Sequence, residues 1–276
     1  MKKKKIIEDI ATYAAIIVML FFTLLPILIL FFNAFKSNDT FMFQTGLLPD
    51  DWTLDNFTHV IEKANFLLYI KNSLIVGVVV TAITIIVTGM SGYALSRFKG
   101  KIFTGFKVVT YAYQLVPLVL ILVPLFVIVR TMGLFDSLLS VILCYIAFEV
   151  PLCSWIMKGY FDTIPIDIEE SAFIDGCTRM QSFSRIIIPL ALPGVASAAV
   201  ITFNYTWCEY MLANLFINDE NVKTITVGLS TFVEQNNTRW GYMMAGAVLA
   251  SIPAILLIIL AQKYVVQGLS SGAVKE

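Results

Sequence analysis

Long apolar runs separated by shorter polar stretches occupy most of the chain. Six of these runs can each cross the hydrocarbon core of a bilayer, which takes about 20 helical residues at about 1.5 Å per residue. The pattern predicts transmembrane helices at Ala11 to Phe35, Ser73 to Ser96, Phe103 to Val129, Leu138 to Tyr160, Leu190 to Leu215 and Tyr242 to Ala261. We therefore expect an all-α polytopic membrane helix bundle of about six transmembrane helices, forming a single transmembrane domain over residues 1–276.

The composition agrees with lipid as the main solvent. Hydrophobic residues make up 58% of the chain and charged residues 14%, against about 25% charged residues in an ordinary soluble domain. The net charge is zero, and the basic residues are scattered without a continuous stripe, which argues against a nucleic-acid partner. The four cysteines show no CxxC pairing, so we expect neither disulfides nor a metal site.

The orientation follows from the distribution of positive charge. An even number of spans puts both termini on one side, and the lysine cluster at Lys2 to Lys5 makes that side cytoplasmic by the positive-inside rule. In this orientation 13 of the 19 Lys and Arg residues fall in cytoplasmic segments. The first apolar run is longer than the core of a signal peptide and has no small-residue cleavage site after it, so we expect it to remain as the first span.

The loop between the fourth and fifth spans, residues 161–189, is too long for a simple turn. Pro165 suits the first turn of a helix, and Gly176 can take the left-handed conformation that ends one. Three acids complement the positive end of that helix dipole: Asp167, Glu169 and Glu170. A second short helix, Thr178 to Ile187, then leads back to the membrane. From the pattern alone, the loop is either a projecting helix–glycine–helix element or an amphipathic hairpin resting on the bilayer.

Within this loop the run from Glu170 to Gly176, ESAFIDG, and the later Ile187, Pro189 and Pro193 resemble the EAA loop of ABC importer permeases. Ser171 stands where that family has its first alanine, and Cys177 where it commonly has an alanine after the glycine. The resemblance implies a coupling helix that sits in a cleft of a cytoplasmic ATPase. It assigns five residues to ATPase coupling: Glu169, Glu170, Ala172, Asp175 and Gly176.

Other segments resemble the carbohydrate-uptake branch of that family, specifically its maltose-type second permease. They are Asn72 to Leu74, Gly92 to Phe98, the C-terminal run from Gln262 to Lys275, and the WNEF-like motif from Trp207 to Tyr210, which has Cys208 at the Asn position. The resemblance implies a permease subunit of a binding-protein-dependent ABC importer in the bacterial cytoplasmic membrane. It would form half of the translocation path for a sugar or oligosaccharide.

The same resemblance implies the partners. They are a second related permease, two ATPase subunits, and an extracellular or periplasmic solute-binding protein. The chain has no GxxxxGK[ST] phosphate loop, so ATP and Mg²⁺ would be bound by the partner ATPase and this chain would hold no cofactor. Neither HExxH nor a nucleophile motif is present, so we expect no enzyme activity. The alternative is a secondary transporter or channel subunit for a small polar solute, which would not need the long cytoplasmic loop.

Several residues inside the predicted spans are candidates for the substrate path. Glu149 is either pore-lining or a satisfied structural acid, and Glu209 either closes an outer gate or reaches the interface. Asn204 and Trp207 lie three residues apart on one helix face, where an amide and a ring suit a sugar. Further candidates by residue type are Tyr145, Tyr113 and Gln114, although aromatic residues in membrane helices more often serve packing.

Overall fold

The structure is a computed structural model that describes residues 2–38, 41, 46–233 and 238–273. Side chains are described only between residues 9 and 262 of these ranges. The side chains of Lys2 to Lys5, and those of the C-terminal run after Gln262, therefore lie outside the described residues.

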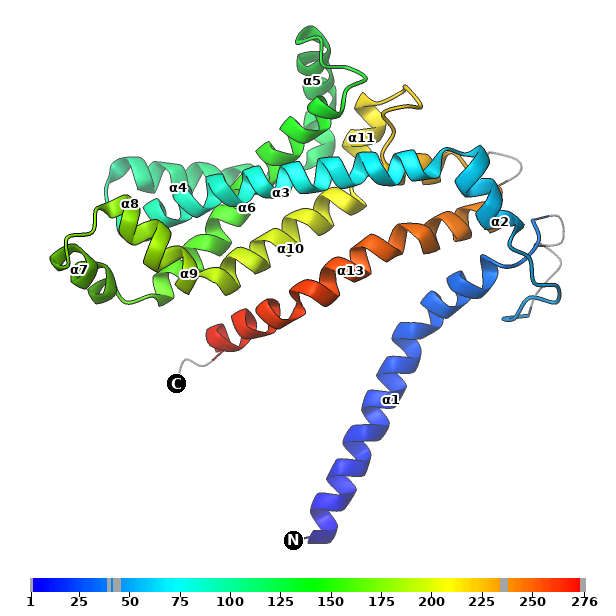
Figure 1. Cartoon of the computed structure of the whole chain (residues 1–276), viewed down its shortest axis with the longest axis horizontal. Coiled ribbons are helices and arrows are strands. Elements are labelled where there is room, and N and C mark those ends of the chain that lie inside the picture. The colour runs from blue at the N-terminus through cyan, green and yellow to red at the C-terminus, as the bar shows by residue number, and fades with distance from the viewer. Residues whose placement is uncertain (1, 39–40, 42–45, 234–237, 274–276) are drawn as a thin grey trace. The chain divides into compact units, whose positions relative to one another are not determined.

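Every regular element in the described ranges is a helix, which confirms the all-α prediction (Figure 1). The helices are α1 (Lys2–Asn33), α2 (Asp55–Thr58) with a π-helical turn (His59–Lys63), α3 (Phe66–Arg97), α4 (Lys101–Gln114), α5 (Leu118–Thr131), α6 (Leu138–Thr163), α7 (Ile166–Ile174), α8 (Arg179–Ser182) with a π-helical turn (Phe183–Ile187), α9 (Ile188–Leu190), α10 (Leu192–Cys208), α11 (Met211–Phe216), α12 (Ile225–Ser230) and α13 (Trp240–Ala273).

Among the described residues, four helices are individually long and apolar enough to cross a membrane, and two bent helix pairs raise the number to as many as six. The four are α1, α3, α6 and α13. The pairs are α4 with α5, bent by 103°, and the helical stretch Arg179–Leu190 with α10, bent by 75°. The prediction of about six membrane helices is therefore confirmed, whereas two of the predicted spans are not continuous helices.

The two interrupted spans have local causes. The span predicted at residues 103–129 breaks between α4 and α5, where Pro117 is extended and has no backbone N–H to continue the helical ladder. The span predicted at residues 190–215 ends at Cys208, because Glu209 adopts an extended backbone conformation before α11 begins.

The chain divides into two compact units. Unit 1 comprises residues 1–67 and 228–252, and unit 2 comprises residues 68–227 and 253–276, so α13 contributes to both. The single-domain interpretation of the sequence stays a prediction.

Unit 1 is organised around the buried side chain of Asn56. Its amide donates to the backbone oxygens of Ala34, at 2.8 Å, and Lys36, at 2.7 Å. Its own oxygen accepts from the amide of Asn38 at 2.5 Å, and the Asn38 oxygen accepts from the N–H of Gly241 at 3.0 Å. Asn56 thus satisfies the carbonyls at the C-terminal end of α1 and links them to the start of α13.

Unit 2 is built along α6, which packs against α10, α4 and α11. Apolar clusters lie at two levels of this helix, one around Tyr145 and Leu212 and the other around Met157 and Phe161. Helix α3 approaches α6 very closely at Gly92, where an added Cβ would lie 2.7 Å from the Cβ of Met157. Glycine permits this approach because it presents only backbone at the helix interface.

Candidate functional site

The loop between α6 and α10 forms a helix, a glycine turn and a second helix. Pro165 precedes α7, and Gly176 follows it with a φ of +87°, a value that favours glycine. The hydroxyl of Thr178 then accepts from the N–H of Gln181 at 3.3 Å, while the Gln181 side chain accepts from the N–H of Thr178 at 2.8 Å, which closes a capping box at the start of α8. The predicted helix–glycine–helix element is confirmed.

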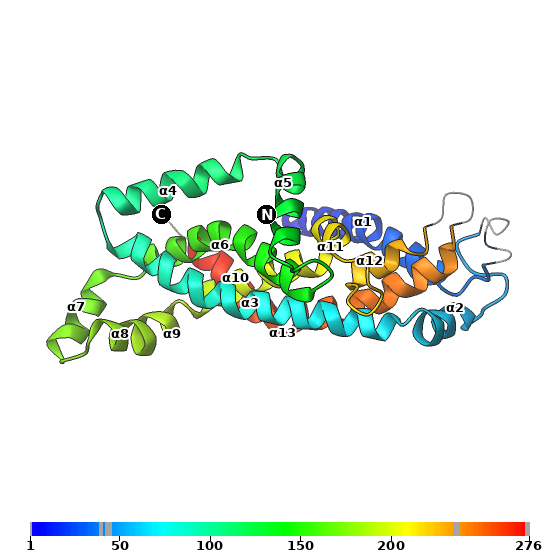
Figure 2. The ribbon, with the colours of Figure 1, turned by 90° about the horizontal axis from the view of Figure 1, so that it is seen from above.

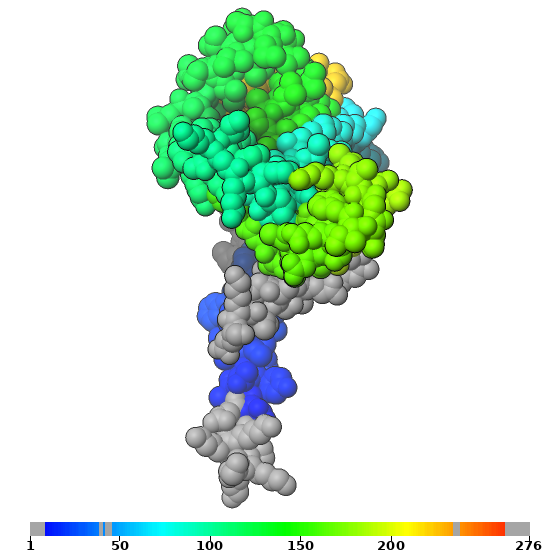
Figure 3. Space-filling view, turned by 90° about the vertical axis from the view of Figure 1, so that its left-hand side faces the viewer, coloured from blue at the N-terminus to red at the C-terminus, as the bar shows by residue number. Residues whose placement is uncertain are grey.

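This loop, residues 164–191, is called the α7 hairpin below. Its surface stands uncovered at one end of unit 2 (Figure 3). Glu170, Asp175 and Gly176 are exposed, and Ile174, the last residue of α7, is 86% exposed. Phe173 and Met180 are exposed as well, so the α7 hairpin presents a group of apolar side chains that suits contact with another chain.

Two residues of the predicted coupling set face the other way. Glu169 is 4% exposed, as is Ala172, so neither lies on the outward surface of α7. The Glu169 carboxylate forms an ion pair with Arg97, and it accepts from the hydroxyl of Tyr93 at 2.7 Å. Glu169 therefore ties α7 to α3, and its predicted ATPase-coupling role stays a prediction.

Arg97 is the functional residue that the sequence reasoning missed. Besides Glu169, its guanidinium donates to the backbone oxygens of Phe161, at 3.0 Å, and Ile164, at 2.9 Å, which are the last carbonyls of α6. The sequence does hold a signal for Arg97. It lies within the segment Gly92 to Phe98, which resembles the carbohydrate-uptake branch, although the resemblance assigns the arginine no role.

Aromatic rings form a second tie between α3 and the α7 hairpin. The guanidinium of Arg179 lies 5.3 Å from the ring centre of Phe98 and 5.9 Å from that of Phe173. The rings of Tyr93 and Phe183 lie 4.9 Å apart. Cation–π contacts of exposed groups contribute about 0.5 to 1 kcal/mol each, so this tie is weaker than the buried ion pair.

Glu149 lies inside α6 and is 3% exposed. Its carboxylate is 3.7 Å from the thiol of Cys153, which in turn lies 3.2 Å from the hydroxyl of Thr202 on α10. The acid is therefore enclosed between two helices with polar neighbours. Cys153 and Thr202 were not predicted, and no spacing along the sequence places them together.

Tyr145 and Glu209, predicted separately, are brought together. The hydroxyl of Tyr145 donates to the Glu209 carboxylate, which also accepts from the N–H groups of Leu212, at 2.9 Å, and Ala213, at 3.2 Å. Those amides belong to the first turn of α11, where a carboxylate is favourable. Glu209 thus caps α11, an arrangement that neither the gate nor the interface reading of the sequence included.

The remaining path candidates have different surroundings. Asn204 is exposed and borders a hollow of about 270 Å³, whereas Trp207 is buried and stacks on Phe203 at 5.6 Å between ring centres. Tyr113 is half-buried against Phe148, at 5.7 Å between ring centres, and Gln114 is exposed at the end of α4. The structure brings four of the predicted path residues into one neighbourhood around Tyr205: Tyr113, Tyr145, Glu149 and Glu209.

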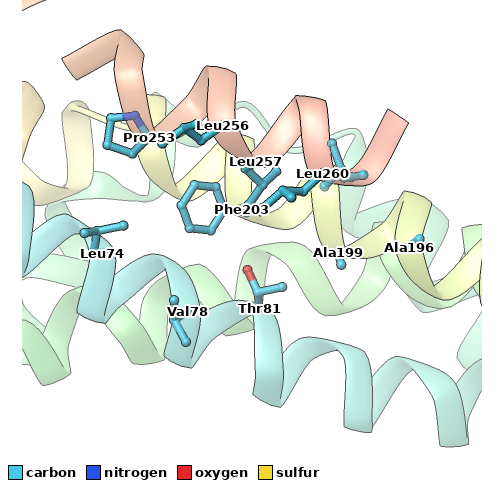
Figure 4. A pocket seen from close by; sticks show the side chains of 12 residues that line it. Leu74, Val78, Thr81, Ala196, Ala199, Phe203, Pro253, Leu256, Leu257 and Leu260 are labelled. Carbon is cyan, nitrogen blue, oxygen red and sulfur yellow. The ribbon is translucent and has the colours of Figure 1, made fainter. Parts of the chain in front are cut away.

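A larger hollow of about 660 Å³ lies between α3, α10 and the second half of α13 (Figure 4). Its lining is aliphatic and aromatic apart from Thr81: Leu74, Val78, Ala196, Ala199, Val200, Phe203, Pro253, Leu256, Leu257, Leu260 and Ala261. None of the predicted path residues borders it. Such a lining offers a hydroxyl-rich solute few hydrogen-bond partners.

Known proteins resemble this chain over nearly its whole length. It is 36% identical over 91% of its residues to the probable ABC transporter permease protein YurM of Bacillus subtilis, covering 83% of that protein. It is 30% identical over 99% of its residues to the trehalose/maltose transport system permease protein MalG of Thermococcus litoralis, covering 99% of that protein. One chain of a crystal structure of a bacterial ABC transporter involved in the import of the polysaccharide alginate matches 95% of this chain, and 98% of its own length, with a TM-score of 0.77 and 23% identity, which shows a shared fold.

Residues 85–271 match the family described as binding-protein-dependent transport system inner membrane component. That region contains the α7 hairpin, Arg97 and all the path candidates. The chain is thus a multi-pass membrane transport protein rather than a catalytic enzyme. Because the match covers well over half of the sequence, the chain belongs to the binding-protein-dependent inner membrane components, the permeases of ABC transporters.

Proposed function

We propose that this chain is one permease subunit of a bacterial ABC importer for a sugar or oligosaccharide. It forms half of the translocation path, and a second related permease forms the other half. Two separate ATPase subunits bind ATP and Mg²⁺ and hydrolyse the nucleotide, so this chain holds no cofactor. The observation that carries the proposal is the uncovered α7 hairpin, which is ordered by its own proline, glycine turn and capping box.

The exposed side of α7 supplies the contact with the ATPase. Glu170 and Asp175 offer carboxylates, Ile174 offers an apolar side chain at the tip, and Gly176 sets the turn. An apolar centre with a polar rim is the usual composition of a protein interface. An ATPase drives transport only if its nucleotide states bind this surface differently, because a ligand shifts an equilibrium only through differential affinity.

The substrate class rests on relatives and on chemistry. The relative from Thermococcus litoralis is named for trehalose and maltose transport, and the two chains align over nearly their full lengths. Asn204, exposed on α10 beside a hollow, has the amide that suits a sugar hydroxyl. The family description implies a solute-binding protein, which would deliver the sugar on the outer side of the membrane.

The orientation that fits these partners places the α7 hairpin and both termini in the cytoplasm. Six membrane segments bring the chain back to its starting side, counting each bent pair as one span. The positive-inside rule favours the same orientation. The protein would reside in the bacterial cytoplasmic membrane.

The test is co-purification of the detergent-solubilised permease with its ATPase. Glu170→Lys reverses an exposed charge on α7, and Gly176→Pro forces a negative φ where the structure has +87°. We expect each variant to retain less than about a tenth of the ATPase that the wild type retains, which corresponds to about 1.4 kcal/mol of binding free energy.

Asp51→Lys is the matched control, since it makes the same charge reversal on an exposed residue of unit 1. It should retain the ATPase at the wild-type level. Size-exclusion profiles would show whether each variant remains folded. Undiminished ATPase association in folded Glu170→Lys and Gly176→Pro would contradict the docking role of the α7 hairpin.

A further inference from the structure

The last turn of α3 touches each part of the corner where α6 passes into the α7 hairpin. Figures 1 and 2 show α7, α8 and α9 near the C-terminal end of α3, with α7 farthest out. Tyr93 and Arg97 reach Glu169 on α7, Ser96 donates to Asp162 near the end of α6 at 2.6 Å, and Phe98 lies under Arg179 at the start of α8. The end of α3 therefore meets three consecutive elements, α6, α7 and α8, that lie far from it in sequence.

Arg97 is the centre of this corner. One guanidinium binds the Glu169 carboxylate, the Phe161 and Ile164 carbonyls and the hydroxyl of Ser96. The two carbonyls lie at the C-terminal end of α6, where backbone oxygens lack helical partners and the helix dipole is negative. Lysine has a single ammonium and could not reproduce this planar, forked set of bonds.

Burial makes the corner resist separation. The side chains of Arg97 and Glu169 are 8% and 5% exposed. A buried charge that loses its partner is strongly unfavourable, because water does not replace the lost interaction. If α7 moved away from α3, the Glu169 carboxylate would lose both Arg97 and Tyr93, and Arg97 would keep only its bonds to Ser96 and the end of α6. Concerted movement of the three elements keeps all of these bonds.

Close helix packing reinforces the same corner. Besides the Met157 contact, a Cβ at position 92 would lie 2.9 Å from the backbone nitrogen of Lys158, so α3 and α6 touch backbone to backbone one turn before Arg97. Packed interfaces of this kind rearrange between discrete states rather than deform continuously. The corner is thus fixed by contact as well as by charge.

We propose that Arg97 is a positioning residue that makes the end of α6, α7 and the cytoplasmic half of α3 move as one body. Displacement of α7 is then passed directly to α3, which borders the hollow opposite α10 and α13. This inference rests on the proposed function, in which an ATPase moves the α7 hairpin. It assigns the transmission step to a residue outside the hairpin.

The experiment measures the distance between α3 and α7 in the assembled complex, in lipid nanodiscs, by pulsed electron paramagnetic resonance. Spin labels are placed at Met90→Cys on α3 and Ile166→Cys on α7, two exposed positions outside the proposed ATPase contact. Cys177 and Cys208, which are not buried, are replaced by serine. Spectra are recorded without nucleotide and with ATP, Mg²⁺ and vanadate.

In the otherwise wild-type permease we expect one narrow distance that is the same in both nucleotide states. In Arg97→Gln the distribution should broaden and shift on addition of nucleotide, because α7 then moves without α3. Glu169→Gln, which keeps the shape of the side chain, should also broaden and shift the α3–α7 distance. It replaces Arg97→Gln in the test if that variant does not fold. In Arg97→Lys the width of the distance distribution should lie between that of the wild type and that of Arg97→Gln.

Lys158→Gln is the matched control. It removes a cation at the same corner, but Lys158 pairs with Asp162 on its own helix, and Asp162 keeps its bond from Ser96 of α3 without it. Its α3–α7 distance should stay narrow and constant. Broadening in Lys158→Gln equal to that in Arg97→Gln would overturn the inference, because any weakening of the corner would then suffice.

A wild-type α3–α7 distance that changes with nucleotide, in a complex that retains its ATPase, would overturn the inference and leave the proposed function intact. So would a constant narrow distance in both Arg97→Gln and Glu169→Gln. Failure of the wild-type chain to retain any ATPase would instead overturn the proposed function, and this inference with it.

Discussion

The two ends of α3 hold neighbouring loops by different chemistry. The C-terminal end holds α7 through a buried ion pair between Arg97 and Glu169. At the N-terminal end, the side-chain amide of Asn72 donates to the backbone oxygens of Asn221 and Lys223, both at 3.0 Å. The C-terminal end thus uses a buried ion pair, whereas the bonds from Asn72 at the N-terminal end join a neutral amide to peptide backbone.

The loop at the N-terminal end, residues 217–227, is fixed at other points as well. Ser73 accepts from the N–H of Ile225 at 2.8 Å. On the other side, the carboxylate of Asp136 accepts from the N–H groups of Asn218 and, at 2.9 Å, Asp219. These bonds satisfy the backbone of a segment with little regular structure and hold its path along α3.

The difference teaches how one helix can serve two purposes. Neutral hydrogen bonds to backbone contribute about 0.5 to 1.5 kcal/mol each, so a loop held by them can open locally at moderate cost. Removing one partner of a buried ion pair costs about 3 to 5 kcal/mol, because the other charge is left buried without a partner. The C-terminal end of α3, called the inner end below, therefore suits transmission of force. The N-terminal end, called the outer end below, suits a loop that is ordered and can open locally.

The largest expected effect comes from separating α3 and α6 at the inner end. In Gly92→Val the new side chain would meet the Met157 Cβ at 2.7 Å and the Lys158 nitrogen at 2.9 Å. Backbone cannot give way as a flexible side chain does, so we expect a loss of about 3 kcal/mol or more in the free energy of unfolding. The fall in thermal midpoint of the detergent-solubilised protein measures it.

Gly89→Ala is the control on the same helix. Its added Cβ would lie 3.8 Å from the Ile188 Cδ1, an ordinary contact, so the thermal midpoint should stay the same or rise slightly. An unchanged midpoint in Gly92→Val would mean that the close approach does not hold the inner end together.

An intermediate effect is expected at the outer end. Asn72→Ala removes two hydrogen bonds to backbone oxygens and should cost about 1 to 2 kcal/mol of unfolding free energy. Hydrogen exchange of residues 217–227 should quicken more than exchange along α6, because the loop is released while the helices stay packed.

Lys71→Gln, on an exposed neighbour of Asn72, should leave both the midpoint and the exchange rates unchanged. Equal acceleration of exchange in the loop and in α6 would contradict the view that the outer loop opens by itself.

The fold was predictable wherever hydrophobicity alone decides. The runs that became α1, α3, α6 and α13 are long and apolar, and their existence needed no knowledge of contacts. The two spans that failed as single helices depend on local backbone choices at Pro117 and Glu209. The segment after Asn218, which has no long apolar run, contains α12 (Ile225–Ser230), which is held partly by Ser73 from a distant helix.

The secondary structure of the candidate site was predictable from the sequence, whereas its long-range side-chain contacts were not. Proline, acids and glycine at fixed spacing predicted the α7 hairpin, because each favours a backbone conformation at or near its own position. The sequence treats Glu169 and Glu170 alike, yet Glu170 faces outward and Glu169 meets Arg97, 72 residues away along the chain. Nor could spacing reveal that Tyr145 and Glu209, 64 residues apart, share one hydrogen bond.

The smallest expected effect concerns charge at the outer end. The pKa of Glu220 is lowered, chiefly by its bond to the Lys223 ammonium at 2.5 Å and also by the hydroxyl of Tyr69, which donates to it at 2.6 Å. Because its pKa is lowered, the ionised Glu220 carboxylate stabilises the folded state at any pH above 4.5, the ordinary pKa of a glutamate. This contribution is lost as the pH falls through the lowered pKa.

Glu220→Gln should therefore lower the thermal midpoint at about pH 7, and the difference from wild type should vanish as the pH falls to about 3. The Glu220 side chain is 63% exposed, so solvent screening should keep the effect below about 1 kcal/mol. In a Lys223→Met background the same substitution should have a smaller effect at about pH 7, since the main cause of the lowered pKa is then absent. A difference that persists unchanged at low pH would show that Glu220 acts through its shape, and the outer end would then be held by neutral contacts alone.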